Sequence, residues 1–278
     1  MANTLTGTPA AAAIYVQVRE HAAALDAPPC LAAVSVGAQP DDRAYLRSIA
    51  LSAEDCGITV RPVPLPADCA PEALTDTLRT LSTDGAVHGV LLLRPLPEAL
   101  RAQEMLDTLD ARKDVDGMTT ASLGTLVTGA AGFAPCTAEA CMELLRAHGI
   151  DPAGRRVTIV GRSLVIGRPA ALLLTRADAT VTLCHRKTPD LAARCRDADI
   201  LLAAAGTPGL ITTDFVRPGQ IVLDAGATAL PDGTLRGDVA PDAAAIAVCT
   251  PVPGGIGSVT TALLLRHTVQ AAENLRHF

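Results

Sequence analysis

The sequence has 278 residues, of which 49% are hydrophobic and 19% are charged, and its formal net charge is −6. A chain this long and this apolar can bury a hydrophobic core, which excludes an intrinsically disordered protein. The negative charge and the lack of any run of Lys or Arg argue against nucleic acid and anionic membranes as main partners.

No apolar stretch reaches the roughly 18 residues that a membrane-spanning helix needs. The N-terminus lacks the basic start and the apolar run of a signal peptide, since Pro9 and Gln17 interrupt it. The eight cysteines form no CxxC pair, which favours reduced, buried thiols. We therefore expect a cytoplasmic protein, and we predict no metal site.

Short apolar runs rich in β-branched residues alternate with helical patterns along the whole chain. This alternation is typical of an α/β fold in which helices cover both faces of a parallel sheet. A Gly- and Thr-rich stretch before Thr137 and a Pro/Gly cluster at 251–257 are the predicted domain boundaries. The predicted strands are 31–37, 58–63, 89–93, 157–161, 179–185, 199–205 and 220–226, and the predicted helices include 45–56, 137–148 and 259–276.

The strand predicted at 157–161 ends in Gly161 and runs into a helix. A glycine there lets the backbone turn tightly, and a helix N-terminus offers free N–H groups to a pyrophosphate. The spacing from Gly161 to Gly167 is not that of the common G-x-G-x-x-G motif, so any strand–turn–helix explains it equally well. This segment is a weak indication of a dinucleotide site by itself.

The strand at 179–185 is more informative about the cofactor. In NAD-binding Rossmann units an acidic residue near the end of this strand binds the ribose 2′-hydroxyl, whereas a cation suits a 2′-phosphate. Here Arg186 and Lys187 follow the strand and no acid does, which favours NADP, although a solvated basic turn remains the alternative. Cofactor rings usually lie at strand ends such as those at 204–207 and 224–228.

Several short motifs, spread over essentially the whole chain, resemble those of one enzyme family. They are Lys113-Asp-Val-Asp-Gly117, Pro135-Cys-Thr137, Val160-Gly-Arg-Ser163, Gly237-Asp-Val239 and Thr250-Pro-Val-Pro-Gly-Gly-Ile-Gly257. Their sequences and their order are similar to those of the bifunctional methylenetetrahydrofolate dehydrogenase/methenyltetrahydrofolate cyclohydrolases. The resemblance implies oxidation of 5,10-methylene- to 5,10-methenyltetrahydrofolate with NADP, then hydrolysis to 10-formyltetrahydrofolate, by a homodimer.

The resemblance also implies a domain organisation and a set of site residues. An N-terminal α/β catalytic domain, which binds folate, would cover residues 1–136 and the returning helix 258–278, and a Rossmann-type NADP-binding domain with a parallel sheet would cover 137–257. The expected substrate residues are Tyr45, Asp116, Pro253, Gly254 and Gly255. The expected cofactor residues are Thr137, Gly161, Arg162, Ser163, Ile166, His185, Arg186, Gly206, Thr207 and Ala227.

The chain departs from the family pattern at two catalytic positions. Tyr45 matches the tyrosine that stacks on folate, but Ile49 stands where the family has its catalytic Lys, one helical turn further on. Leu93 replaces the Gln that supports this Lys, and the adjacent Arg94 should point to the opposite face of the strand. Ser258 is a further departure in the segment after the Pro/Gly cluster.

These departures affect the two reactions differently. Hydride transfer mainly requires alignment of the two rings. Hydrolysis needs water to be deprotonated and a nitrogen to be protonated, and loss of a positioned acid or base typically costs about 10²–10⁴-fold. We therefore predict a dehydrogenase with little or no cyclohydrolase activity.

Three other interpretations remain open at this point. The chain could act on a different folate-like substrate in a specialised pathway, or it could bind folate or NADP without catalysis. The full bifunctional enzyme would need a cation from elsewhere, and Lys113, the nearest candidate, belongs to a motif that places it differently.

Overall fold

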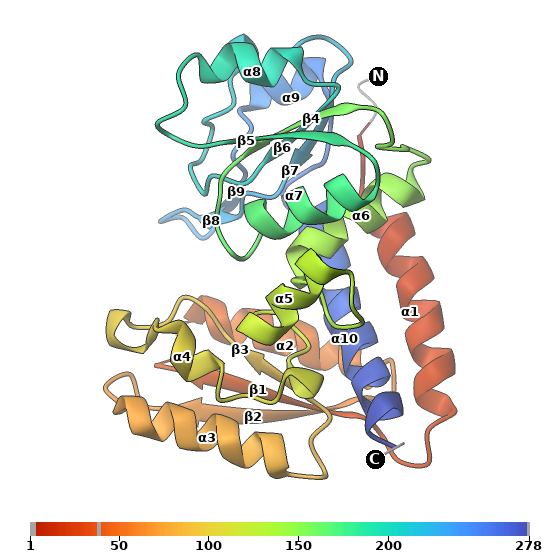
Figure 1. Cartoon of the computed structure of the whole chain (residues 1–278), viewed down its shortest axis with the longest axis vertical. Helices are drawn as coiled ribbons and strands as arrows, with labels where there is room; N and C mark the ends of the chain where they lie inside the picture. Colours follow the sequence, from red (N-terminus) through yellow and green to blue (C-terminus); the bar gives the residue numbers. More distant parts are fainter. Residues whose placement is uncertain (1–3, 38–39, 277–278) are drawn as a thin grey trace. The chain divides into compact units, whose positions relative to one another are not determined.

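The chain, described by a computed structural model over residues 4–37 and 40–276, divides into two compact α/β units (Figure 1). The three-stranded unit contains Ala13–Cys136 and the segment from Thr261 onward. The five-stranded unit contains Thr137–Thr260 and the segment up to Ala12. The predicted α/β class with parallel sheets is confirmed. Within the described residues, no helix is both long and apolar enough to cross a membrane.

The three-stranded unit is built on a parallel sheet in the order β2-β1-β3. The central strand β1 is buried along its middle, and Pro62 and Pro64 lie on the edge strand β2, where missing N–H donors are tolerated. Helices α2 and α3 cover opposite faces of the sheet (Figure 1). The elements are α1 (Thr8–Ala23), β1 (Cys30–Val36), α2 (Pro40–Glu54), β2 (Thr59–Leu65), α3 (Pro71–Thr83), β3 (Gly89–Leu92), η1 (Glu98–Leu100), α4 (Gln103–Leu106), η2 (Ala111–Lys113), α5 (Thr120–Thr128) and α10 (Ile256–Leu275), of which α1 and α10 each contribute residues to both units.

The five-stranded unit has a parallel sheet in the order β10-β7-β6-β4-β5. Helix α7 covers one face, and α8 and α9 cover the other (Figure 1). Because β4 lies between β5 and β6, the chain leaves β4 in one direction and later returns on its other side. The elements are α6 (Cys136–Ala147), β4 (Arg156–Val160), α7 (Gly167–Arg176), β5 (Thr180–Cys184), α8 (Leu191–Asp197), β6 (Ile200–Ala203), η3 (Thr213–Phe215), β7 (Ile221–Asp224), the hairpin β8 (Thr228–Ala229) and β9 (Leu235–Arg236), α9 (Pro241–Ile246) and β10 (Val248–Cys249).

The helix predicted at 45–56 begins earlier than expected, at Pro40. Proline has no N–H to contribute and a φ suited to the first helical turn, so it starts a helix readily. The predicted strand at 157–161 ends at Val160, because Gly161 has a φ of +128° and leaves the strand conformation.

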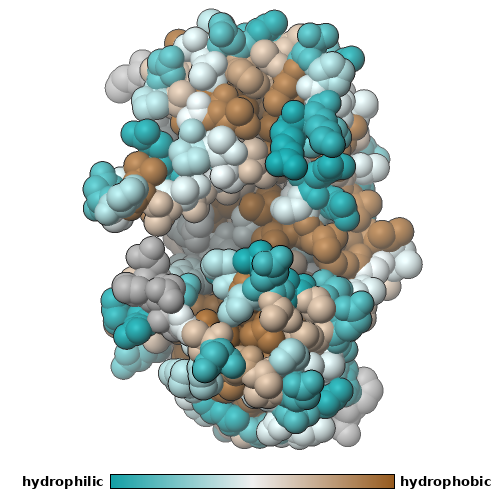
Figure 2. Space-filling view, turned by 90° about the vertical axis from the view of Figure 1, so that its left-hand side faces the viewer, coloured by the Kyte–Doolittle hydropathy of each residue, from teal (hydrophilic) through white to brown (hydrophobic). Residues whose placement is uncertain are grey.

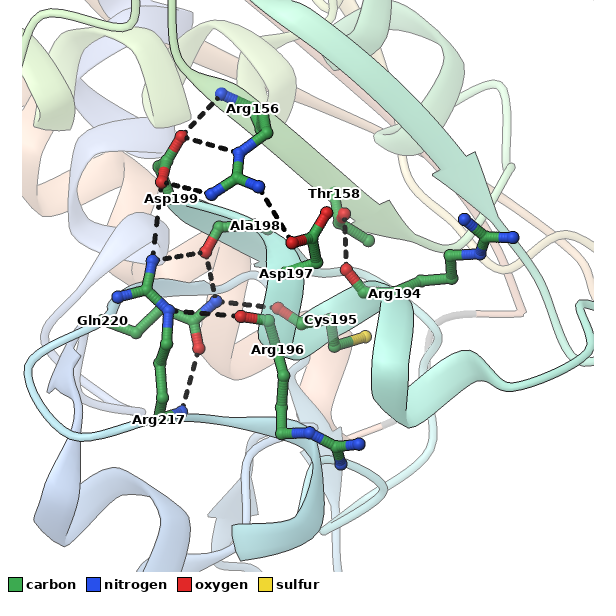
Figure 3. A network of polar contacts seen from close by, with 10 residues as sticks. All are labelled: Arg156, Thr158, Arg194, Cys195, Arg196, Asp197, Ala198, Asp199, Arg217 and Gln220. Atoms are coloured by element: carbon green, nitrogen blue, oxygen red, sulfur yellow. Dashed lines mark hydrogen bonds and ion pairs between the residues drawn. The ribbon is translucent and has the colours of Figure 1, made fainter.

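The amino ends of the strands in the five-stranded sheet are tied together by ion pairs (Figure 3). The Arg156 guanidinium contacts Asp197 at 2.8 Å and Asp199 at 3.1 Å, and the backbone N–H of Arg156 also donates to Asp199. The Gln220 amide donates to the carbonyls of residues 195 and 198 at 2.7 and 2.8 Å. This network lies at the end of the sheet opposite the predicted cofactor residues.

None of the eight cysteines, all of which lie within the described residues, forms a disulfide, and six of them are buried. Burial raises the pKa of Cys141, Cys195 and Cys249 to about 12 in each case. These thiols are neutral at physiological pH and pack as small hydrophobic side chains.

Exposed large hydrophobic side chains come from separate elements, for example Leu51 on α2 and Val127 on α5. Figure 2 shows one face of the molecule, on which hydrophilic and hydrophobic residues are mixed over most of the surface and hydrophobic residues also gather midway down the right-hand side. Scattered exposed apolar side chains of this kind are normal and indicate no particular partner.

Candidate active site and cofactor site

Tyr45 and Ile49 lie one turn apart on α2 and therefore on the same side of the helix. Tyr45 is 41% exposed, whereas Ile49 is completely buried. Partial burial, followed by the charge of Asp116, raises the pKa of Tyr45 above its ordinary value, and a hydrogen bond with the Thr261 side chain opposes this rise. Tyr45 is thus a neutral phenol at physiological pH and a poor general base.

Asp116 lies in a tight turn after η2. The next residue, Gly117, has a φ of +68°, and a Cβ there would lie 2.5 Å from the Ala134 carbonyl carbon. Burial, followed by the charge of Asp114, raises the pKa of Asp116 to about 7. The carboxyl group therefore changes its charge near neutral pH, and when ionised it can accept two hydrogen bonds from a ring edge with N–H donors.

Asp114 belongs to the same motif but has a structural role. It is buried and accepts hydrogen bonds from the Thr119 N–H and the Ser122 hydroxyl, each at 2.7 Å. Thr119 is the N-cap of α5, so Asp114 fixes the start of that helix. Of the two acids, Asp116 is the less deeply buried one.

Leu93 and Arg94 follow the carboxyl end of β3 and differ in their burial. Leu93 is buried and its N–H donates to the Val34 carbonyl at 2.9 Å, whereas Arg94 is exposed. Val90 pairs in parallel with Asp114, which brings the residues that follow both segments to the same edge of the sheet. The Arg94 charge accordingly lowers the pKa of Asp116, against the larger effect of burial.

His267 on α10 is a buried neighbour of this site that the sequence did not suggest. Its Nδ1 lies 2.8 Å from the Val115 carbonyl oxygen, and the Cys136 thiol donates to the same oxygen at 3.3 Å. The Phe133 ring lies 4.9 Å from the imidazole, centroid to centroid. These contacts hold the backbone immediately before Asp116, and nothing in the sequence near His267 resembles the motifs that indicated the site.

Lys113 is directed away from the site. Its ammonium group donates to the carbonyl oxygens of Leu81 and Asp84, at 3.0 and 2.8 Å. Desolvation lowers its pKa, and the charges of two nearby aspartates oppose this change. Its placement agrees with the prediction from its motif.

The predicted folate residues Pro253, Gly254 and Gly255 lie in the five-stranded unit. Gly254 has a φ of +98°, and its carbonyl accepts the Gly7 N–H at 2.9 Å. A Cβ on Gly255 would lie 2.5 Å from the Pro251 carbonyl oxygen, and the Ser258 hydroxyl donates to the Gly255 carbonyl at 2.8 Å. This turn is therefore a fixed stretch of bare backbone.

The turn after β4 requires glycine at two positions. A Cβ on Gly161 would lie 2.0 Å from the Ala204 carbonyl oxygen, and a Cβ on Gly167 would lie 2.0 Å from the Gly161 carbonyl oxygen. The Ser163 hydroxyl accepts the Ile166 N–H at 3.2 Å, and α7 begins directly afterwards. The turn thus presents a narrow backbone cradle at a helix N-terminus, which suits a pyrophosphate.

The turn after β5 is fixed by His185 and presents two cations. The His185 N–H donates to the Thr188 hydroxyl at 2.9 Å, and the Lys187 N–H donates to His185 Nδ1 at 3.2 Å. Arg186 and Lys187 are both exposed. The remaining predicted cofactor positions are Thr137 on α6, Gly206 and Thr207 after β6, and Ala227 after β7.

Comparison with known proteins gives this arrangement a family. Residues 5–116 match the catalytic domain, and residues 135–276 the NAD(P)-binding domain, of tetrahydrofolate dehydrogenase/cyclohydrolase. This chain belongs to the tetrahydrofolate dehydrogenase/cyclohydrolase family. The family predicted from the short motifs is therefore confirmed, and the NAD(P)-binding match includes Thr137–Thr260 of the five-stranded unit and continues along α10.

Relatives and solved structures of the family match the chain over nearly its whole length. It is 47% identical to bifunctional protein FolD 1 of Rhodococcus jostii over 98% of this chain and 93% of that protein. The crystal structure of the bifunctional enzyme from Campylobacter jejuni has a TM-score of 0.93 and 37% identity, covering 98% of this chain and 99% of the other. The Trypanosoma brucei enzyme, complexed with NADP cofactor and inhibitor, has a TM-score of 0.92 and 34% identity, covering 99% and 98%.

Proposed function

We propose that this family member oxidises 5,10-methylenetetrahydrofolate to 5,10-methenyltetrahydrofolate with NADP and has little or no cyclohydrolase activity. The observation that carries the proposal is Ile49, a completely buried aliphatic side chain at the position where the family resemblance expects a catalytic Lys. Leu93, also buried, stands at the position of the supporting Gln. The Rhodococcus relative is named a bifunctional protein, and the proposal separates this chain from it.

Neither lysine of the chain is placed to act as the acid or base that cyclohydrolysis needs. The whole sequence contains two lysines, Lys113 and Lys187. Lys113 donates to two backbone carbonyls at the end of α3, and Lys187 belongs to the turn after β5 in the other unit. Tyr45, whose pKa is raised, has little tendency to take a proton from water at neutral pH.

The remaining groups suit the dehydrogenase reaction. Asp116 can orient the pterin ring by accepting hydrogen bonds from the N–H donors of the pterin. Tyr45 offers a half-exposed ring on which the pterin can stack. Bound NADP supplies the hydride acceptor, so the protein mainly has to align two rings, which requires no acid or base. Folate-dependent chemistry at Asp116 and Tyr45 is therefore compatible with the loss of the Lys.

Two features support NADP as the cofactor. The turn after β4 is a cradle that a Cβ on Gly161 or Gly167 would fill. Arg186, in the exposed turn after β5, is a cation for the 2′-phosphate, and the first acid after it is Asp190, beyond the turn.

A spectroscopic assay tests the proposal. Enzyme, methylenetetrahydrofolate and NADP are mixed, and NADPH and the methenyl chromophore are followed together. We expect both signals to rise with equal stoichiometry, and the methenyl signal then to decay at the rate measured in buffer with heat-denatured protein. Decay that accelerates in proportion to native enzyme would refute the loss of cyclohydrolase activity.

A second candidate is the same chemistry on a different folate-like substrate. Arg94 favours it, because this exposed cation lies at the sheet edge beside Asp116 and acts on its charge. NADPH formation from ordinary methylenetetrahydrofolate at a rate typical of enzymes excludes this candidate and also a catalytically silent binding protein. A rate near that of buffer, with NADP still bound, favours the altered substrate or the silent protein.

A further inference from the structure

The loop after β6 is exposed, yet three consecutive backbone N–H groups in it point inward. Ala205 and Gly206 donate to Oδ2 of Asp238 at 2.6 and 3.0 Å, and Thr207 donates to Oδ1 at 2.7 Å. Asp238 is completely buried. A single carboxylate thus accepts the N–H of every residue from 205 to 207.

Asp238 is held in place by a second buried carboxylate. Oδ1 of Asp224, at the end of β7, accepts the N–H groups of Asp238 and Gly226, each at 2.9 Å. Oδ2 of Asp224 accepts the Val239 N–H, also at 2.9 Å. The two acids act in series, because Asp224 orders the backbone of Asp238 and Asp238 orders the loop.

Two glycines make room for this arrangement. A Cβ on Gly226 would lie 2.5 Å from Oδ1 of Asp238, and a Cβ on Gly237 would lie 2.0 Å from Oδ2 of Asp224. Neither position can carry a side chain while both carboxylates keep their contacts. The Gly237-Asp238-Val239 motif therefore has a definite physical task at the carboxyl edge of the sheet.

The chemistry of the loop determines which part of a dinucleotide it suits. Successive backbone N–H groups often form a concave site for an anion. Here the protein's own carboxylate fills that site, so a phosphate would find these three donors already engaged and a negative charge beneath them. The loop is suited to a part of the cofactor that carries no phosphate.

The strand order assigns the same part of the cofactor to this loop. A dinucleotide lies across the crevice where the strand order reverses, here at β4, between β5 and β6. Arg186 follows β5 and is the expected contact of the 2′-phosphate. The opposite end of the cofactor, which carries the nicotinamide, then extends toward the loop after β6.

We propose that Asp238 is a positioning residue that shapes the 205–207 loop to receive the nicotinamide and its ribose. The role rests on the proposed use of NADP. Asp238 does not touch the cofactor, and it acts through the three N–H groups that it fixes.

The test separates the two ends of the cofactor with the Asp238→Asn variant. The amide replaces one acceptor oxygen with a donor, so the loop loses part of its support. We expect the Kd for NADP to rise about ten-fold, which matches the loss of one charged hydrogen bond. The Kd for adenosine 2′,5′-bisphosphate, which has the 2′-phosphate but no nicotinamide, should stay within two-fold of the wild type.

Asp199→Asn is the matched control. Asp199 also accepts a backbone N–H, that of Arg156, but at the amino edge of the same sheet (Figure 3). We expect this variant to bind both ligands within two-fold of the wild type. Equal weakening of both ligands in Asp238→Asn, or no weakening of either, overturns the role of Asp238, whereas a wild-type protein that does not bind NADP overturns the proposed cofactor itself.

Amide exchange on the wild-type chain keeps the proposal testable if Asp238→Asn does not fold. The N–H groups of residues 205–207 should exchange slowly although the loop is exposed, and NADP should slow them further while adenosine 2′,5′-bisphosphate should not. Fast exchange in the free protein, or equal protection by both ligands, overturns the proposal.

Discussion

The two parallel sheets of this chain differ in what their carboxyl ends carry. In the five-stranded sheet these ends consist of tight glycine turns and backbone groups that buried acids hold in place, such as the loop fixed by Asp238. In the three-stranded unit the corresponding end carries Leu93, with Ile49 on the adjoining helix, where the family resemblance expects Gln and Lys.

The difference shows that the two kinds of site depend on different parts of the chain. A dinucleotide cradle depends on backbone geometry, which glycines at several positions determine together. Acid–base chemistry depends on single side chains at single positions. Under the proposed function, two substitutions are enough to remove one reaction while the structures that support the other stay intact.

The largest expected effect comes from introducing the Lys and Gln that the family resemblance implies at positions 49 and 93. Ile49→Lys combined with Leu93→Gln should accelerate decay of the methenyl signal by about 10²-fold or more, because a positioned acid or base contributes at least that much. Position 49 is completely buried, so the lysine stem has to extend along the helix for its ammonium group to reach Tyr45.

Ile49→Met with Leu93→Gln is the matched control, because methionine is also unbranched but has no amine. It should hydrolyse methenyltetrahydrofolate no faster than the wild type. If the folded lysine variant behaves like the methionine control, the assignment of position 49 is wrong.

A smaller effect is expected from Gly161→Ala in the five-stranded unit. Its Cβ would lie 2.0 Å from the Ala204 carbonyl oxygen, so the backbone has to move, which should lower the free energy of unfolding by about 3 kcal/mol and weaken NADP binding. Gly154→Ala is the control, since Gly154 has a φ of +70° but open space around it, and about 1 kcal/mol is expected. Urea unfolding compares the two variants, and equal losses would contradict the role of close packing.

Arg186→Ser should change cofactor choice rather than stability. Loss of a charged contact to the 2′-phosphate should raise the KM for NADP about ten-fold and leave the KM for NAD unchanged. The same change at Arg194, an exposed residue on α8, controls for net charge and should affect neither. A parallel rise for both cofactors would show that Arg186 does not discriminate between them.

The smallest effect is a pH dependence of folate binding. Because the pKa of Asp116 is raised to about 7, its carboxyl is neutral below that pH and ionised above it. The ionised form accepts two hydrogen bonds from the pterin, so the KM for methylenetetrahydrofolate should rise several-fold when the pH is lowered from 8 to 6. In Asp116→Asn the KM should be higher and flat over this range, and a wild-type profile that is equally flat would exclude titration of Asp116.

Patterns of local sequence predicted much of the fold. The apolar runs predicted the strands β1 to β7 to within two residues at each end, but they did not predict the two-residue strands β8, β9 and β10. The tight turn at Gly161 was also foreseeable, because a glycine after a buried strand signals a change of backbone direction.

Contacts between distant residues could not be predicted in this way. Asp238 lies 31 residues after Thr207, and His267 lies 152 residues after Val115. Nothing in the local sequence indicates which N–H groups a buried acid will accept. The resemblance to the family identified the motif around Asp238, but the physical task of the motif emerged only from its hydrogen bonds.

The positions of the thiols allow local unfolding of each unit to be followed by alkylation. The sequence contains no tryptophan and two tyrosines, so intrinsic fluorescence is a weak probe. An alkylating reagent, however, reacts with the six buried thiols only when local unfolding exposes them, and each reaction adds a fixed mass. Of the buried thiols, Cys56 and Cys136 belong to the three-stranded unit and Cys141, Cys184, Cys195 and Cys249 to the five-stranded unit, so peptide masses can reveal which unit opens first.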